Sequence, residues 1–145
     1  MNPSTGREAT EIEYCYRLSM TLGEHSVGHF RRILRMLLKS WRMTDVCDAA
    51  ELALTELVTN VLRHVPEDPH CTVQILRHAR VLRVEVTDRS PNPLHARTPE
   101  GLSEGGRGLL LVDAVSDHWG TTPAPTGPPG KTVWFECETK NDDDR

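Results

Sequence analysis

The stretch AAELALTELVTNVLRHV, residues 49–65, predicts the helix around which the rest of the chain is organised. Its apolar residues recur at the spacing of a helical face: Leu52, Leu54, Leu57, Val58, Val61 and Leu62. Glu56, Asn60 and His64 follow one another at intervals of four residues, so a helix stacks them in one line. Burying such a group without a partner costs about 1–3 kcal/mol, so the line should face water, a metal ion, a phosphate or another side chain.

The composition is typical of one soluble, globular domain. The chain has 145 residues, of which 37% are hydrophobic and 26% are charged, enough for a sizeable core. The net charge of -4 argues against a nucleic-acid-binding domain, which would normally carry a basic patch. No apolar run approaches the roughly 20 residues of a membrane span. The N-terminus has no apolar signal-peptide core, so we expect a cytoplasmic protein.

The four cysteines are widely spaced and form no CxxC pair: Cys15, Cys47, Cys71 and Cys137. This pattern favours reduced thiols over a disulfide framework or a structural zinc site. The seven histidines show no HxH or HExxH spacing, which argues against a catalytic metal site built from histidine.

Outward from the organising helix, the pattern predicts another helix and several strands. Residues 24–41 have helical apolar spacing, and Thr44 or Asp45 is expected to cap the helix that ends before Pro66. Alternating residues predict strands at 13–21, 71–78, 81–88 and 131–139, the middle two forming a hairpin. A short apolar helix is expected over 109–115 and a short strand near 117–120.

The order of these elements favours an α+β fold, with one mostly antiparallel sheet covered by helices on a single face. We expect residues 1–12 to be a flexible N-terminus, 13–139 a single domain and 140–145 a charged flexible tail. The segment 89–108 is rich in proline and glycine and has no periodicity, which is typical of a functional or disordered connection.

Three polar features carry candidate chemistry. Asn60 offers a neutral oxygen to a hard cation such as magnesium, and Glu56 lies one turn away as a candidate proton acceptor. Asp88, at a strand end, is suited to accept a hydrogen bond from the exocyclic amine of a base. The segment Gly105-Gly106-Arg107-Gly108 precedes a helix, where backbone N–H groups and an arginine favour a phosphate.

Each feature also has a structural explanation. Glycines often mark a helix-starting turn, Asp88 can cap a turn, and Glu56 can pair with an arginine. Gly130-Lys131-Thr132 contains GKT, but a strand follows it and not a helix, which excludes a P-loop. No GxSxG elbow supports a Ser/His/Asp triad.

The order of the motifs resembles the nucleotide-binding boxes of the GHKL ATPase superfamily. These motifs are ELVTN (56–60), DRSP (88–91), GGRGLLLV (105–112) and GKTVW (130–134). Within the superfamily, the chain is most similar to anti-sigma-factor serine/threonine kinases of the RsbW/SpoIIAB type, in their actinobacterial form. The resemblance covers roughly residues 14–138. It implies the Bergerat fold, a two-layer α/β sandwich of the histidine-kinase-like ATPase type.

The resemblance implies ATP and Mg²⁺ as cofactors and a role for each matching residue. Asn60 would bind magnesium, and Glu56 would act as the catalytic general base toward a protein serine. Asp88 would bind the adenine amine. The remaining residues expected to contact the nucleotide are Ser90, Gly106, Arg107, Gly108, Leu109 and Thr132. Arg63 and His64 fall where the family often has a basic residue, with roles left open.

The resemblance also implies partners. The protein would bind a sigma factor and phosphorylate a STAS-domain anti-anti-sigma factor, with no direct contact to nucleic acid or membrane. Its relatives often form homodimers. One departure is that the superfamily has DxGxG after the aspartate, whereas here both glycines are absent from Asp88-Arg89-Ser90-Pro91-Asn92.

Three functions therefore stay open. The first is a protein serine kinase that switches partners, favoured because Glu56 accompanies Asn60. The second is a non-catalytic ATP-binding regulatory module, favoured by the altered segment after Asp88. The third is a metabolic enzyme that uses Glu56 and His64 as an acid/base pair and has no nucleotide affinity.

Overall fold

The computed structural model describes residues 12–64, 67, 69–89, 104–125 and 130–141; the side chains of 12, 13 and 104–108 lie outside the description. The described residues form β1 (Ile12–Thr21), α2 (Ser26–Ser40), a 3₁₀ turn η1 (Thr44–Val46), α3 (Cys47–His64), β2 (His70–His78), β3 (Val81–Asp88), α4 (Glu104–Val115), β4 (His118–Pro123) and β5 (Lys131–Glu138). The predicted order of helices and strands is confirmed.

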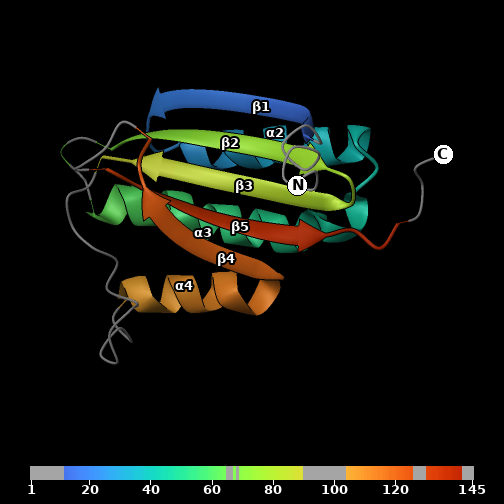
Figure 1. Ribbon diagram of the computed structural model, residues 1–145. Coiled ribbons are helices and arrows are strands. Elements are labelled where there is room, and N and C mark those ends of the chain that lie inside the picture. The colour runs from blue at the N-terminus through green and yellow to red at the C-terminus, as the bar shows by residue number, and fades with distance from the viewer. Residues whose placement is uncertain (1–11, 65–66, 68, 90–103, 126–129, 142–145) are drawn as a thin grey trace, which may run out of the picture.

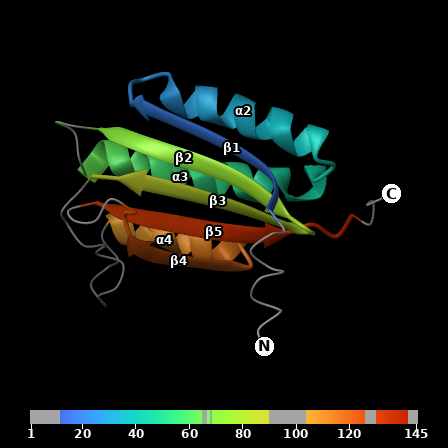
Figure 2. The same cartoon turned by 45° about the horizontal axis from the view of Figure 1, so that its top comes forward.

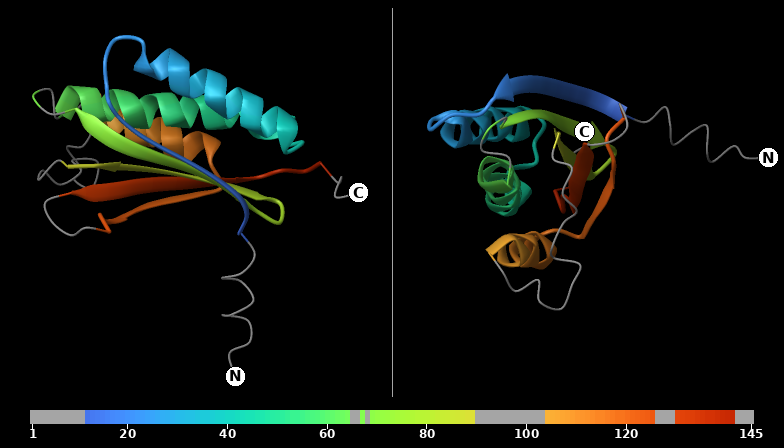
Figure 3. Two further views of the ribbon diagram at one scale, coloured as in Figure 1. Left: turned by 90° about the horizontal axis from the view of Figure 1, so that it is seen from above. Right: turned by 90° about the vertical axis from the view of Figure 1, so that its left-hand side faces the viewer.

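The strands make one antiparallel five-stranded sheet in the order β1-β2-β3-β5-β4. The three helices α2, α3 and α4 lie side by side on one face of this sheet (Figure 3). The fold is therefore the expected α+β two-layer sandwich. No helix among the described residues is long and apolar enough to cross a membrane.

The alternation of each strand separates a core face from an outer face. Along β3, Leu82, Val84 and Val86 are buried while the intervening residues are half-buried. On the outer face, the Arg83 guanidinium lies 4.1 Å from the Trp134 ring centroid and pairs with Glu85 and Glu136 at 2.7 and 2.9 Å. One face packed and one face polar is the common arrangement of antiparallel sheets.

Helix α3 occupies the middle of the helical layer, and four residues of its predicted apolar face are buried: Leu54, Leu57, Val58 and Val61. Ala50 and Ala53 are fully buried, whereas Leu52 is 39% exposed. Glu51 is also buried, at 9% exposure, because Arg31 and Arg35 of α2 reach its carboxylate. The small alanines allow α3 to lie close to its neighbours, and a leucine-only pattern does not reveal this.

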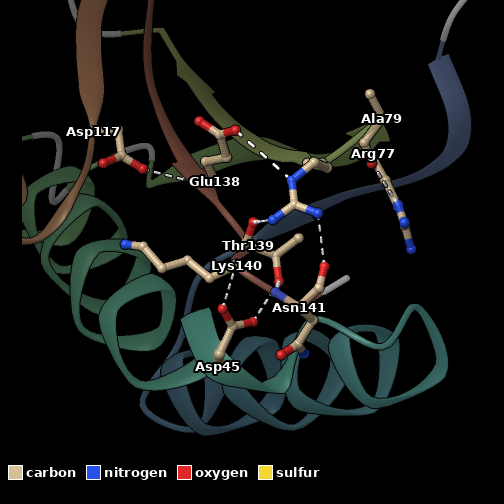
Figure 4. A network of polar contacts seen from close by, with 9 residues as sticks. Asp45, Arg77, Ala79, Asp117, Glu138, Thr139, Lys140 and Asn141 are labelled. Carbon is tan, nitrogen blue, oxygen red and sulfur yellow. Dashed lines mark hydrogen bonds and ion pairs between the residues drawn. The ribbon is translucent and has the colours of Figure 1, made fainter. Parts of the chain in front are cut away.

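The start of α3 is tied to the end of β5 by Asp45. Its two carboxylate oxygens accept hydrogen bonds from Thr139 Oγ1 at 2.6 Å and from the backbone N–H of Lys140 at 2.7 Å (Figure 4). Thr44 and Asp45, the expected helix caps, lie instead within η1, whose N-cap is Met43. The Asn141 side chain also donates a hydrogen bond to the Arg42 carbonyl, which adds a further contact between the C-terminal segment and the start of the helix.

Helix α4 is longer than the predicted helix at 109–115. It begins at Glu104, so the glycines of GGRG form its first turns instead of preceding it. Leu109 and Val112 are buried against α3 and the sheet, and this packing outweighs the low helix propensity of glycine. At the far end of α4, Asp113 accepts a 2.8 Å hydrogen bond from the indole of Trp119 on β4.

Asp45 makes the stability of the fold depend on pH. Burial alone would raise the pKa of Asp45, but the bonds from Thr139 and Lys140 outweigh it and hold the pKa below its ordinary value of 3.8. A lowered folded-state pKa contributes stability that is present above the ordinary value and lost as pH falls through the folded-state value. Asp45→Ala should therefore lower the free energy of unfolding by about 1 kcal/mol at neutral pH, a modest loss because the side chain is exposed.

Urea unfolding of wild type and Asp45→Ala at pH 7 and near pH 3 measures this effect. The difference between the two proteins should shrink at the lower pH. Thr139→Val removes the hydroxyl donor at similar size. In this background, Asp45→Ala should lower the free energy of unfolding by less than it does in the wild-type protein. An equal difference at both pH values would contradict the assigned role of Asp45.

Candidate functional site

The candidate residues lie at the end of the molecule where α3 and β3 finish and where α4 and β5 begin (Figures 1 and 2). Glu56 and Asn60 come from the second half of α3, and Asp88 is the last residue of β3. Asn60 and Asp88 therefore reach the same end of the sandwich from different layers. Packing of α3 on the inner sheet face, through Leu57, Val58 and Val61, fixes this arrangement.

Glu56 and Asn60 are both half-buried and one helical turn apart. The Asn60 Oδ1 accepts a hydrogen bond from Arg63 Nη1 at 3.1 Å. An amide oxygen carries two lone pairs, so Asn60 can keep this bond and still offer an oxygen to a cation. Within the described part of the chain, the Glu56 carboxylate makes no hydrogen bond or ion pair, in contrast to Glu51 on the same helix.

Asp88 is buried, at 7% exposure, and it faces Lys131 of the neighbouring strand. The Lys131 Nζ lies 3.0 Å and 3.2 Å from the two carboxylate oxygens of Asp88. Both side chains point to the inner sheet face, because Asp88 shares the parity of Val86, and Lys131 that of Val133. The negative charge of the buried Asp88 carboxylate is thus balanced by the Lys131 ammonium.

Thr132 lies on the opposite sheet face from Asp88. Its hydroxyl and that of Thr87 share a hydrogen bond of 2.7 Å, as the register pairs these two residues. The position beside Asp88 belongs to Lys131, which sequence reasoning did not single out. Strand parity was the available signal: counting back by two from Phe135 through Val133 leads to Lys131 on the core side.

Cys71 lies opposite Asp88 across the β2–β3 pair and is fully buried. Burial, and next the negative charge of Asp88, raise the pKa of the Cys71 thiol to about 12. The thiol is therefore neutral at physiological pH. It flanks Asp88 on the side opposite Lys131 and brings no further charge to the site.

The first turn of α4 supplies backbone donors at this end of the molecule. The first four N–H groups of a helix, here those of residues 104–107, have no partner within the helix and favour an anion. Gly106, Arg107 and Gly108 belong to these opening turns, but the Arg107 side chain lies outside the description. Leu109 is 2% exposed and packs in the core. Ser90 lies outside the described residues.

Gly130 brings β5 close to the end of β3. A Cβ atom added to Gly130 would lie 2.5 Å from the Asp88 carbonyl oxygen and 3.0 Å from Ala124 Cβ. Only glycine fits this approach, and the approach sets Lys131 beside Asp88. Gly130 is therefore a second site-forming residue that the sequence motifs did not identify as such.

Comparisons with known proteins bear on the fold of the chain. A family model described as a histidine kinase-like ATPase domain matches residues 21–136, well over half of the chain. Among solved structures, a chain of the SiaB–SiaC complex from Pseudomonas aeruginosa is similar, with a TM-score of 0.64 and 14% identity, covering 93% of this chain and 96% of that one. At this identity the likeness concerns the fold. No match is found among curated proteins.

The donor set fits a magnesium-bound nucleotide. Asp88 is a buried acceptor suited to a base amine, the α4 N-terminus offers N–H donors for phosphate, and Asn60 offers one neutral oxygen. Among the described residues, no cluster of three or more His, Cys, Asp or Glu side chains forms a metal site. This is compatible with magnesium, which takes most of its ligands from water and phosphate in such sites.

Substituting Gly130 tests the close approach of the two strands. Gly130→Ala should lower the free energy of unfolding by about 1–3 kcal/mol, because a methyl group would overlap the Asp88 backbone. Gly23→Ala is the matched control, since nothing lies within 4 Å of an added Cβ there. Chemical denaturation measures both. Equal stability of the two variants would contradict the assigned packing.

Proposed function

The chain belongs to the histidine kinase-like ATPase domain family, and on this premise we propose that it is an ATP-dependent protein serine/threonine kinase that also acts as an anti-sigma factor. The observation that carries the proposal is the pairing of Glu56 with Asn60 on α3. Glu56 is half-buried one turn from a candidate cation ligand, and its carboxylate makes no hydrogen bond or ion pair with the described residues. Binding ATP needs no such base, whereas transferring phosphate to a hydroxyl does.

Each residue of the site has one task in this proposal. Glu56 takes the proton from the serine hydroxyl of a bound protein substrate. Asn60 holds the cation through Oδ1, with Arg63 orienting its amide. Asp88 accepts from the base amine, and the α4 N-terminus binds phosphate oxygens. Magnesium-bound ATP supplies the transferable phosphoryl group and neutralises charge during transfer.

The proposed substrate is a serine on a small STAS-domain protein, and phosphorylation of that protein would leave the kinase free to bind a sigma factor. Support comes from the sequence motifs, which resemble those of anti-sigma-factor kinases. A solved neighbour of the same fold was crystallised as a complex of two proteins, SiaB and SiaC, which is compatible with a fold that binds a protein partner.

A second candidate is a regulatory module that binds ATP without transferring phosphate. The segment after Asp88 favours it, because both glycines of the superfamily's DxGxG motif are absent there. Calorimetry discriminates the two: magnesium-dependent ATP binding that Asn60→Ala abolishes, without transfer to any partner, would favour the module. The expectation of a metabolic enzyme with no nucleotide affinity conflicts with membership of an ATPase domain family.

Phosphate transfer is measured with radiolabelled ATP, magnesium and the STAS-domain proteins encoded in the same genome, each with a serine-to-alanine control. Glu56→Gln should lower the transfer rate by about 10²–10⁴-fold with little change in ATP affinity, because it removes a base and not a ligand. Glu138→Gln is the matched control, since the Glu138 side chain is 61% exposed and lies opposite Val81, at the other end of β3 from Asp88.

Two results would overturn the kinase proposal. One is the absence of transfer to every STAS protein tested, and the other is an unchanged rate in Glu56→Gln. Loss of ATP binding in Asn60→Ala with intact folding would support the cation role of Asn60 independently of transfer.

A further inference from the structure

The base-binding carboxylate of the proposed site has a charged neighbour that is built into the sheet. Lys131 Nζ contacts both oxygens of Asp88, at 3.0 and 3.2 Å, and the side chains are 17% and 7% exposed. Surface lysines normally keep their ammonium in water. Here the ammonium is directed inward, where a buried ion pair needs good geometry to offset desolvation.

The strand register places Lys131 directly beside Asp88. The two residues are partners in the β3–β5 pair, and the close approach at Gly130 holds the two strands together at this point. On the other side of Asp88 lies the buried, neutral thiol of Cys71. Lys131 and Asp88 thus form one unit at the end of β3, a donor beside an acceptor.

The Lys131 ammonium has a hydrogen-bond donor to spare. An ammonium has three donors, and contacts to two carboxylate oxygens leave at least one. A carboxylate oxygen can accept more than one hydrogen bond, so Asp88 stands as an acceptor beside this donor. An acceptor and a donor side by side match the edge of adenine, where the 6-amino donor adjoins the N1 acceptor.

We propose that Lys131 is a specificity-determining residue that donates a hydrogen bond to N1 of adenine while Asp88 accepts one from the 6-amino group. The inference rests on the proposed nucleotide-binding function. It adds a residue that recognises N1, the second polar atom on this edge of adenine. Asp88 alone would recognise only the amine. With Lys131, loss of either atom weakens binding.

The test compares ATP with 1-deaza-ATP, in which N1 is replaced by C–H and the amine is kept. Dissociation constants are measured by calorimetry with magnesium for wild type, Lys131→Met and Lys131→Arg. Wild type should bind ATP about tenfold or more tightly than 1-deaza-ATP, as expected for one hydrogen bond to a charged group. In Lys131→Met the preference should fall to within about twofold, and Lys131→Arg should retain much of it.

The preference is a ratio within one protein, so a smaller folded fraction of a variant does not alter it. Lys39→Met, at an exposed position near the end of α2, controls for removal of a positive charge and should keep the wild-type ratio. Thermal melting of each variant verifies folding, since Lys131→Met leaves Asp88 without this counter-ion.

The possible failures are distinguishable. A Lys131→Met protein with the wild-type ratio, or one that binds ATP more tightly at an unchanged ratio, overturns the role of Lys131; the latter result would make the ammonium a competitor for Asp88. Equal binding of ATP and 1-deaza-ATP by wild type overturns it as well, while leaving the proposed function intact. If wild type binds neither nucleotide, the proposed function itself fails.

Discussion

Packing of α3 against the inner face of the sheet positions every other part of the molecule. The helix contributes buried residues from Ala50 to Val61, and both α2 and α4 pack on its flanks. The half-buried Glu56 lies at the middle of α3, and Asn60 lies one turn nearer to the end of the helix. The packing of α3 on the sheet thus forms the core and also positions Glu56 and Asn60 in the candidate site.

Local patterns in the sequence were sufficient for the fold and insufficient for the site. Alternation located β2, β3 and β5 to within a residue, since one face of each strand is buried and the other is not. The partner of Asp88 depends instead on a register between strands 43 residues apart, which no local pattern encodes. Motif matching emphasised Thr132, whereas the register brings Lys131 to the carboxylate.

Helix ends were the other place where local reasoning failed. Asp45 looked like a helix cap, but its carboxylate is used by residues almost a hundred positions later. The glycines of GGRG looked like a loop before a helix, yet tertiary packing of Leu109 and Val112 draws them into α4. In both cases a long-range contact overrides a local preference. This is possible because helix and capping preferences amount to only about 1 kcal/mol per residue.

The hydrogen bonds from Thr139 and Lys140 to Asp45 hold the C-terminal segment at the end of the molecule opposite the candidate site. The last described residues of β5 and its extension are held at the start of α3, whereas the candidate site lies where α3 finishes (Figure 1). A fluorophore or affinity tag attached at Asn141 would therefore lie at the end of the molecule opposite the candidate site. Immobilised at this position, the protein would keep the candidate site turned toward solution.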